Sequence, residues 1–317
     1  MGIHYNIAFT GFGSIARRHF QNIRDCLAER GDSCSVDLYR SDSPRPLPPD
    51  AAPFIAHELP FSAPIPDDAH YDVVFVTNPT SMHLDTLRKF SGHTAAFFVE
   101  KPVFDQTSID KSIFSELRDT TCYVACPLRY HPVLAYVKEH VPLQQVISAR
   151  AICSSYLPDW RPGQDYRQCY SAHRDMGGGV GIDLIHEWDY LVHLFGLPQE
   201  CHTIQTKLSG LEIDSDDLAI YIARTDTTSI EVHLDYFGRH AMRTLDLLLP
   251  DDSLHCDLLE GTIDYQREGR RIHLDAQRNN FQLRELEHFL DIIHHHTNND
   301  STLEHAFNVL RIAKGEY

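Results

Sequence analysis

The chain lacks the features of a membrane-spanning, secreted or nucleic-acid-binding protein. No apolar run approaches the ~20 residues that a transmembrane helix needs, and no basic and apolar leader precedes the first predicted strand. A formal net charge of −17 over 317 residues argues against nucleic acid or an anionic membrane as a partner. We therefore expect a cytoplasmic protein in which a local cluster of Arg and Lys must meet any anionic ligand.

Cysteine and histidine are present without the spacing of a metal site. The eight cysteines include no C-x-x-C pair, and Cys122 and Cys153 lie in apolar, strand-like segments, so reduced core thiols are expected. The histidine triplet at 294–296 cannot jointly face one ion, because successive helix residues point about 100° apart. We expect no metal and interpret the triplet as solvated helix surface.

The bulk composition and the order of apolar patterns predict an α/β protein with two domains. Hydrophobic residues make up 42% of the chain and charged residues 23%, as in an ordinary globular protein. Residues 1–125 alternate short apolar runs with helical patterns, which is typical of a doubly wound parallel sheet of the Rossmann type. Residues 126–317 read as an α+β domain with a large open, mostly antiparallel sheet, whose last helices pack back toward the first domain.

The individual elements are expected as follows. The first domain has strands at 5–10, 35–39, 73–77, 95–99 and 122–125, a brief strand near 54–57, and helices at 14–29, 81–90 and 108–117. The second domain has helices at 133–140, 181–194, 282–295 and 302–314, and strands at 145–155, 203–207, 217–224, 229–236, 243–249, 253–258 and 271–275.

The most informative segment is the glycine-rich turn at 11–16, which follows an apolar run and opens a helical pattern. Its G-x-G-x-x-A spacing (GFGSIA) in that context is the fingerprint of a dinucleotide-binding turn. Gly11 would make the tight turn, and Gly13 would let a pyrophosphate approach the backbone. The helix start at Ser14 and Ile15 would offer N–H groups to the phosphates. An ordinary strand–helix turn without a ligand is the alternative.

Four motifs, in this order, resemble the Gfo/Idh/MocA family of NAD(P)-dependent oxidoreductases, of the glucose–fructose oxidoreductase and inositol dehydrogenase type. They are GFGSIA at 11–16, TNPTSMH at 77–83, EKP at 100–102 and GGGVGIDLIHEWDYL at 177–191. The resemblance covers nearly the whole chain. It implies hydride transfer between NADP(H) or NAD(H) and the CH–OH ring carbon of a sugar, sugar nucleotide or cyclitol.

Lys101 is the first candidate catalytic residue. It follows the apolar run at 95–99, at the carboxyl end of a predicted parallel strand, where open α/β sheets bind their ligands. A lysine beside a carboxylate can donate or accept a proton when its pKa is tuned. The resemblance implies that Lys101 is catalytic and that Lys101 and Glu100 contact the cofactor. A solvated lysine in a strand–loop turn is the alternative.

Asp183 and His186 are the second candidate pair. They are three residues apart, which places them on one face of the predicted helix at 181–194. An aspartate can hold an imidazole in one tautomer while the histidine exchanges a proton with a substrate hydroxyl. The resemblance implies that both are catalytic and bind substrate, but inositol dehydrogenase-like members have the pair four apart. Asp183 is therefore either catalytic or a positioning residue, and a packed histidine is the alternative for His186.

The resemblance implies further contacts with cofactor and substrate. Thr77 and Asn78 are expected near the cofactor riboses, and His83 either lines the site or packs in a helix. Arg129 is expected to meet substrate or nicotinamide. The aromatic and charged loop at 156–175 suits a sugar ring, although it could instead pack on a neighbouring subunit. Its expected substrate-binding residues are Tyr156, Trp160, Arg161 and Tyr166.

Arg40 and Ser41, at the end of the second predicted strand, favour NADP as the cofactor. NAD sites place an Asp or Glu there for the ribose 2′-hydroxyl. An arginine pairs with a 2′-phosphate through two hydrogen bonds, and a serine adds a hydroxyl donor. A register shift of one residue would offer Asp42 instead, so NAD stays possible.

Two other functions stay open: a cofactor-dependent glycosidase or lyase without net redox change, and a non-catalytic nicotinamide-binding regulatory protein. The presence of both Lys101 and His186 argues against the regulatory protein. The open sheet of the second domain has a face that needs covering, so a homodimer or homotetramer through this sheet is expected.

Overall fold

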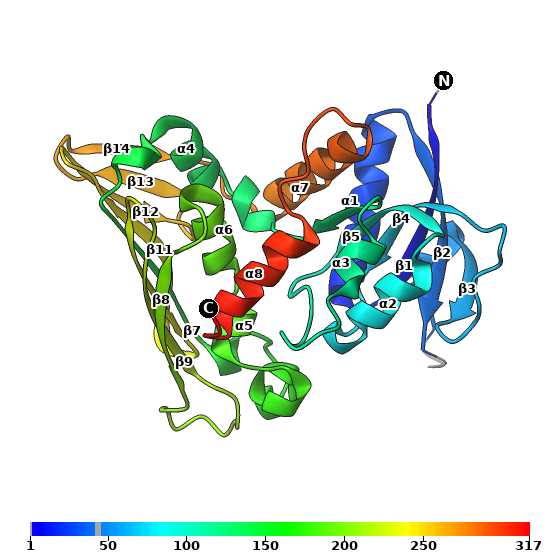
Figure 1. Ribbon diagram of the computed structural model, residues 1–317, viewed down its shortest axis with the longest axis horizontal. Helices are drawn as coiled ribbons and strands as arrows, with labels where there is room; N and C mark the ends of the chain where they lie inside the picture. Colours follow the sequence, from blue (N-terminus) through cyan, green and yellow to red (C-terminus); the bar gives the residue numbers. More distant parts are fainter. Residues whose placement is uncertain (1, 42–45) are drawn as a thin grey trace. The chain divides into compact units, whose positions relative to one another are not determined.

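The computed structural model describes residues 2–41 and 46–317, and the chain divides into two compact units. Unit 1 comprises Met1–Ala125 and Gln282–Phe307, and unit 2 comprises Cys126–Phe281 and Asn308–Tyr317. Figure 1 shows the course of the chain through both units.

Unit 1 is built on a six-stranded parallel sheet with the strand order β3-β2-β1-β4-β5-β6 (Figure 1). The order reverses between β1 and β4, and such a switch point is where doubly wound sheets bind their ligands. The predicted Rossmann-type sheet is therefore confirmed. The strands are β1 (His4–Thr10), β2 (Ser33–Arg40), β3 (Ile55–Pro60), β4 (Tyr71–Val76), β5 (Thr94–Val99) and β6 (Thr121–Val124).

The helices of unit 1 cover a largely aromatic core. Phe289 packs edge-on against Phe98 with ring centroids 5.2 Å apart, which fixes one of the last helices on the parallel sheet. The segment predicted as a helix at 108–117 is helical only over five residues. The helices are α1 (Ser14–Glu29), α2 (His83–Phe90), α3 (Ser112–Glu116), α7 (Arg278–Ile293, from Gln282 on) and α8 (Leu303–Ala313, up to Phe307).

The histidine triplet does not form the predicted helix surface. Helix α7 ends at Ile293, and His295 has a φ of 58°, in the left-handed region. The imidazole Nε2 of His294 lies 2.5 Å from the hydroxyl oxygen of Tyr5. Among residues 2–41 and 46–317, no group of three or more His, Cys, Asp or Glu side chains could hold a metal ion.

Unit 2 is built on an eight-stranded sheet with the order β14-β13-β12-β11-β7-β10-β9-β8. All neighbouring strands are antiparallel except β7 and β10, so the predicted mostly antiparallel sheet is confirmed. The short strand β13 was not predicted. The strands are β7 (Ser148–Tyr156), β8 (Glu200–Thr206), β9 (Leu218–Arg224), β10 (Ser229–Asp235), β11 (Phe237–Leu248), β12 (Ser253–Asp257), β13 (Thr262–Tyr265) and β14 (Arg270–His273).

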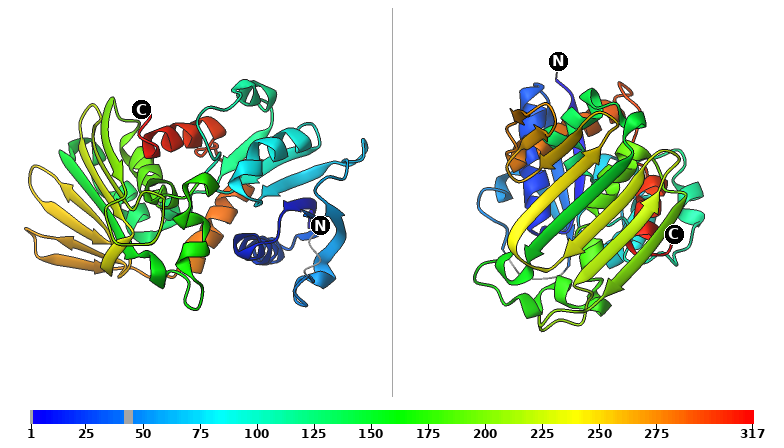
Figure 2. Two further views of the ribbon diagram at one scale, coloured as in Figure 1. Left: turned by 90° about the horizontal axis from the view of Figure 1, so that it is seen from below. Right: turned by 90° about the vertical axis from the view of Figure 1, so that its left-hand side faces the viewer.

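Helices α4 (Pro132–His140), α5 (Val180–Asp183) and α6 (His186–Phe195) lie on one face of this sheet, and Figure 2 shows the opposite face. Trp188 of α6 packs edge-on against Tyr221 of β9 at 5.3 Å, and both rings are fully buried. A Cβ at Gly181 would lie 2.5 Å from the Tyr221 hydroxyl, so α5 can approach the sheet this closely only with glycine there.

The single helix predicted over 181–194 is wrong. The backbone hydrogen bonds change at Leu184 and Ile185: Asp183 N–H donates four residues back, whereas Ile185 N–H donates three residues back, to Ile182. Leu184 has φ −98° and ψ 28°, outside the helical region. Helix α5 therefore ends at Asp183 and α6 begins at His186, so these two residues do not share one helix face.

Two further predictions concern the cysteine thiols and membrane-spanning helices. Cys122 and Cys153 are buried free thiols, as expected, and burial raises the pKa of each to about 12, which makes them poor nucleophiles. None of the helices in the described residues has the length and apolar character of a membrane span.

Candidate functional site

The turn between β1 and α1 leaves the N-terminus of α1 open. Gly11 has a φ of 81°, and its N–H donates to the carbonyl oxygen of Tyr39 at 2.7 Å. A Cβ at Gly11 would lie 3.1 Å from the Cα of Asn78, whereas a Cβ at Gly13 would meet nothing within 4 Å. No side chain caps the 16-residue helix, and its first turn, beginning at Ser14 and Ile15, carries no acidic residue. This end of the helix can therefore accept an anion.

The turn after β4 lies against the glycine turn. The hydroxyl of Thr77 donates to the carbonyl oxygen of Thr10 at 2.8 Å, which joins the ends of β1 and β4. The amide nitrogen of Asn78 donates to the Thr86 hydroxyl at 2.7 Å. The amide oxygen of Asn78 is buried without a hydrogen-bond partner among the described residues. It is an acceptor that a bound hydroxyl could satisfy.

His83 is held inside unit 1 by backbone oxygens. Its Nε2 lies 3.1 Å from the carbonyl oxygen of Asn78, and its Nδ1 lies 3.2 Å from the carbonyl oxygen of Val103. The side chain is 1% exposed, and burial lowers its pKa. These contacts are those of a packed histidine that supports the Asn78 turn.

Glu100 and Lys101 follow directly after β5, and a buried histidine of α1 contacts the glutamate. The Nε2 of His19 lies 2.5 Å from Oε1 of Glu100, and the Lys101 N–H donates to Oε2 at 3.1 Å. Burial would raise the pKa of Glu100, but the hydrogen bond and charge of His19 and the charge of Lys101 lower it overall. Glu100 is therefore a fixed carboxylate between α1 and Lys101. The Lys101–Pro102 peptide bond is cis.

His19 was not among the predicted site residues, although the sequence carries a signal for it. The positions of α1 that face the core are otherwise mostly apolar, from Ala16 and Phe20 to Leu27. A histidine among them needs a buried partner.

Arg40, the last residue of β2, forms an ion pair with a carboxylate. Its Nε donates to Oε1 of Glu58, in β3, at 2.5 Å, and a second guanidinium nitrogen also contacts this oxygen. Ser41 follows and is exposed. Asp42, the alternative considered for this position, lies outside the described residues. Glu58 was not identified from the sequence.

In unit 2, Asp183 is held by a tyrosine that the sequence analysis missed. The hydroxyl of Tyr236 donates to Oδ2 of Asp183 at 2.5 Å, and both residues are buried. Burial and the charge of Asp183 raise the pKa of Tyr236, which keeps its hydroxyl protonated as a donor. The ring of Trp160 packs edge-on against Tyr236 at 5.3 Å. His186 lies half-buried at the start of α6.

Arg129 lies in a buried ion pair with Asp189. Its Nε and one terminal nitrogen donate to the two carboxylate oxygens at 2.9 and 2.7 Å. The arginine side chain is 1% exposed. A buried pair with two hydrogen bonds positions α6, the helix that carries both Asp189 and His186.

The loop predicted to bind substrate makes several contacts within unit 2. The guanidinium of Arg239 lies 3.6 Å from the ring centre of Tyr156, and the hydroxyl of Tyr166 accepts the Glu212 N–H at 3.2 Å. Arg161 lies 5.6 Å from the ring centre of Tyr170. The indole N–H of Trp160 donates to the hydroxyl of Ser155 at 2.9 Å.

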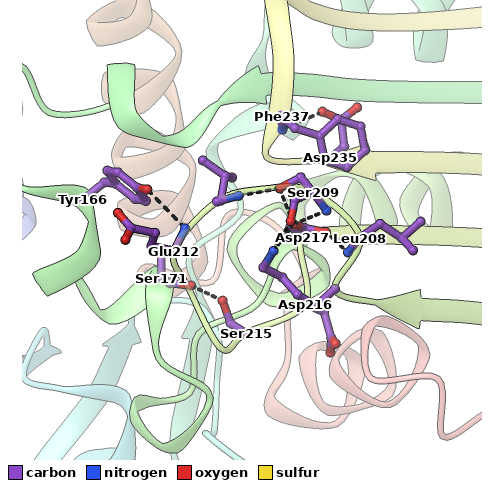
Figure 3. A network of polar contacts seen from close by, with 12 residues as sticks. Tyr166, Ser171, Leu208, Ser209, Glu212, Ser215, Asp216, Asp217, Asp235 and Phe237 are labelled. Carbon is purple, nitrogen blue, oxygen red and sulfur yellow. Dashed lines mark hydrogen bonds and ion pairs between the residues drawn. The ribbon is translucent and has the colours of Figure 1, made fainter.

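Asp217 closes a second loop, residues 207–217, which contacts this one through Glu212 and Ser215 (Figure 3). Its buried carboxylate accepts the Leu208 N–H at 2.7 Å, the Ser209 N–H at 3.0 Å and the Ser209 hydroxyl at 2.5 Å, and the Lys207 ammonium lies 3.1 Å away. Burial would raise the pKa of Asp217, but these donors hold it below its usual value. Its own carbonyl accepts the N–H of Tyr236 at 3.0 Å. In the sequence, the only sign of this role is that Asp217 directly precedes the apolar segment LAIYIA.

The two units define the class of fold: a Rossmann-type unit with a parallel sheet and an α+β unit with a large, mostly antiparallel sheet. No family model and no curated protein sequence matches the chain. Solved structures do match it over nearly its full length, and those described below share less than a fifth of its residues.

Three of these structures illustrate the likeness. UDP-N-acetylglucosamine 3-dehydrogenase GnnA from Acidithiobacillus ferrooxidans has a TM-score of 0.76 at 19% identity, covering 98% of this chain and 96% of its own. Levoglucosan dehydrogenase in complex with NADH and levoglucosan has a TM-score of 0.81 at 15% identity, covering 98% and 96%. An oxidoreductase from Agrobacterium radiobacter in complex with NAD+, L-tartaric acid and magnesium has a TM-score of 0.77 at 16% identity, covering 98% and 94%. The resemblance to Gfo/Idh/MocA-type oxidoreductases is confirmed at the level of the fold.

Proposed function

We propose that the chain is an oxidoreductase that transfers a hydride between NADP(H) or NAD(H) and a ring carbon of a sugar, sugar nucleotide or cyclitol. The observation that carries this proposal is the open, uncapped N-terminus of α1 beside Gly13, at the switch point of the parallel sheet. The two dehydrogenases named above act, by their names, on a sugar nucleotide and an anhydrosugar, which supports the substrate class.

The residues present in unit 1 fit a dinucleotide. The backbone from Gly11 to Ile15 would hold the diphosphate, because the turn is free of side chains and of negative charge. Thr77 and Asn78 would lie near the riboses, and the buried amide oxygen of Asn78 would accept a ribose hydroxyl. Arg40 and Ser41 would favour the 2′-phosphate of NADP, whereas Glu58 would oppose it.

Oxidation of a CH–OH group releases one hydride and one proton, and the nicotinamide supplies the hydride chemistry when it is bound. We assign the hydroxyl proton to Lys101 and His186. Glu100, held between His19 and the backbone N–H of Lys101, would fix the backbone from which the lysine side chain extends. Asp183, fixed by Tyr236, would orient the substrate hydroxyl.

The proposal is tested by fluorescence titration with NADPH and NADH, followed by a panel of sugars and sugar nucleotides monitored at the nicotinamide absorbance band. Lys101→Met should keep dinucleotide affinity within about twofold and lose at least about 100-fold in kcat, as expected for a proton-transfer group. Lys111→Met, at the exposed residue just before α3, is the matched control and should change neither. Cleavage of a substrate without net nicotinamide turnover would instead favour the hypothesis of a cofactor-dependent glycosidase or lyase.

We also propose that a second copy of this chain covers the outer face of the eight-stranded sheet. Ile204 of β8 and Ile222 of β9 are 62% and 58% exposed there, which is unusual for an uncovered surface. Light scattering after gel filtration should give a dimer or tetramer, and Ile222→Glu should shift it toward the monomer. A monomeric wild-type protein at micromolar concentration would contradict this assembly.

A further inference from the structure

The end of β2 carries an ion pair in the position where a dinucleotide sheet distinguishes its cofactors. In the parallel pairing of β2 and β3, Leu38 lies opposite Glu58 and Arg40 lies opposite Pro60. Side chains two residues apart along a strand share a face, so Arg40 and Glu58 meet on the same side of the sheet. One oxygen of Glu58 contacts two nitrogens of the Arg40 guanidinium.

The chemistry at this place depends on the charge of the pair. The end of the second strand of such a sheet contacts the ribose 2′ position, which is a neutral hydroxyl in NAD and a phosphate in NADP. An arginine alone favours the phosphate, because its fork of N–H donors matches two phosphate oxygens. A carboxylate already on the guanidinium cancels that charge and repels the phosphate.

Glu58 is placed to repel an incoming phosphate. Its side chain is 42% exposed, whereas that of Arg40 is 15% exposed, so the carboxylate is the more accessible member of the pair. Like charges about 4 Å apart in water change an equilibrium constant by about fivefold, and a phosphate monoester carries a charge between about −1.5 and −2 at neutral pH. Removing the carboxylate charge should therefore change phosphate affinity by about tenfold.

We propose that Glu58 is a specificity-determining residue, which pairs with Arg40 and lowers the affinity for NADP(H) relative to NAD(H). This inference rests on the proposed function, because it concerns the ribose end of the same dinucleotide. Glu58 acts only on the 2′ substituent, so its effect on NADH should be small.

The test is a fluorescence titration of wild type and Glu58→Gln with NADPH and with NADH. The glutamine keeps an oxygen that can accept from Arg40 but removes the charge. We expect the dissociation constant for NADPH to fall about tenfold and that for NADH to stay within about twofold. The difference should shrink at high salt, because surface charges are then screened.

Two variants serve as controls. Glu116→Gln removes the same charge from another exposed arginine–glutamate pair of unit 1, with Arg88, and should leave both affinities unchanged. Arg40→Gln combined with Glu58→Gln should lose the gain in NADPH affinity, because the phosphate would have no guanidinium to bind.

Each outcome decides between the proposals. An equal gain for both cofactors, the same gain in Glu116→Gln, or a loss of NADPH affinity in Glu58→Gln would overturn the role of Glu58 while leaving the proposed function intact. Absence of binding by either cofactor to the wild-type protein would overturn the proposed function, and this inference with it.

Discussion

Unit 1 and unit 2 position their candidate site residues by different means. In unit 1 the glycine turn is held by main-chain oxygens: Gly11 donates to the carbonyl of Tyr39, and the Thr77 hydroxyl donates to the carbonyl of Thr10. In unit 2, buried side chains hold each other, as in the ion pair of Arg129 and Asp189. A backbone cradle tolerates changes in nearby side chains, whereas a buried charge that loses its partner is costly. Substitutions should therefore cost more stability in unit 2 and mainly binding in unit 1.

The largest effect is expected for Arg129→Met. This change would leave Asp189 without its two-point partner and should lower the free energy of unfolding of unit 2 by about 3–5 kcal/mol. Both tryptophans, Trp160 and Trp188, belong to unit 2, so urea unfolding followed by tryptophan fluorescence reports on this unit. An unchanged midpoint together with loss of substrate affinity would make Arg129 a substrate ligand rather than a structural residue.

Asp217→Ala should lower the free energy of unfolding of unit 2 by about 3 kcal/mol, because it leaves several buried donors without their acceptor. The folded-state pKa of Asp217 is lowered, so its stabilising contribution is present above the unfolded value near 3.9 and is lost as pH falls through the folded value. The difference in the free energy of unfolding between wild type and variant should therefore be largest at pH 7 and decrease below about pH 4. A difference that is constant with pH would show that the carboxylate charge is not responsible.

Gly11→Ala tests the backbone cradle of unit 1. At a φ of 81°, with Asn78 Cα 3.1 Å from the new Cβ, alanine is strained, and we expect a loss of about 2 kcal/mol. Thermal unfolding followed by circular dichroism measures it. Gly92→Ala has the same φ of 81° but open space around its Cβ, so it separates the strain of the backbone from the contact with Asn78.

The smallest effect on stability is expected for Tyr236→Phe, about 1.5 kcal/mol, because only one hydroxyl is removed and the ring still packs on Trp160. Once a substrate is known, kcat should fall about tenfold while the dissociation constant for NADH stays unchanged. Equal kcat values in both proteins would remove Tyr236 from the account of how Asp183 is positioned.

The sequence predicted best what is encoded locally. The apolar runs located all strands of the parallel sheet, and the bounds of α1 agree with its prediction at both ends. Gly11 and Gly13 identified the turn because their roles depend on φ and on free space at single positions. The strands of the parallel sheet and the bounds of α1 were therefore predictable from the composition and the spacing of apolar residues.

The rest depends on contacts between distant segments. Tyr236 lies 53 residues from Asp183, and nothing near either residue indicates the hydrogen bond that joins them. The break at Leu184 was hidden because the apolar pattern continues through it. Strand β13 (TIDY) is only four residues long and has no continuous apolar run, whereas the equally short β6 (TCYV) has one. Glu58 was missed because its partner lies on another strand.

The central claim is that the open end of α1 binds the diphosphate of a nicotinamide dinucleotide, and Gly13→Ala tests it most directly. Gly13 has a φ of −73° and its added Cβ would meet nothing within 4 Å, so thermal unfolding should not change. In a fluorescence titration, the wild type should bind NADH saturably and Gly13→Ala should bind at least about tenfold more weakly, because the methyl group would occupy the space of the diphosphate. Equal NADH affinity in the two proteins, or no binding to the wild type, would contradict the account.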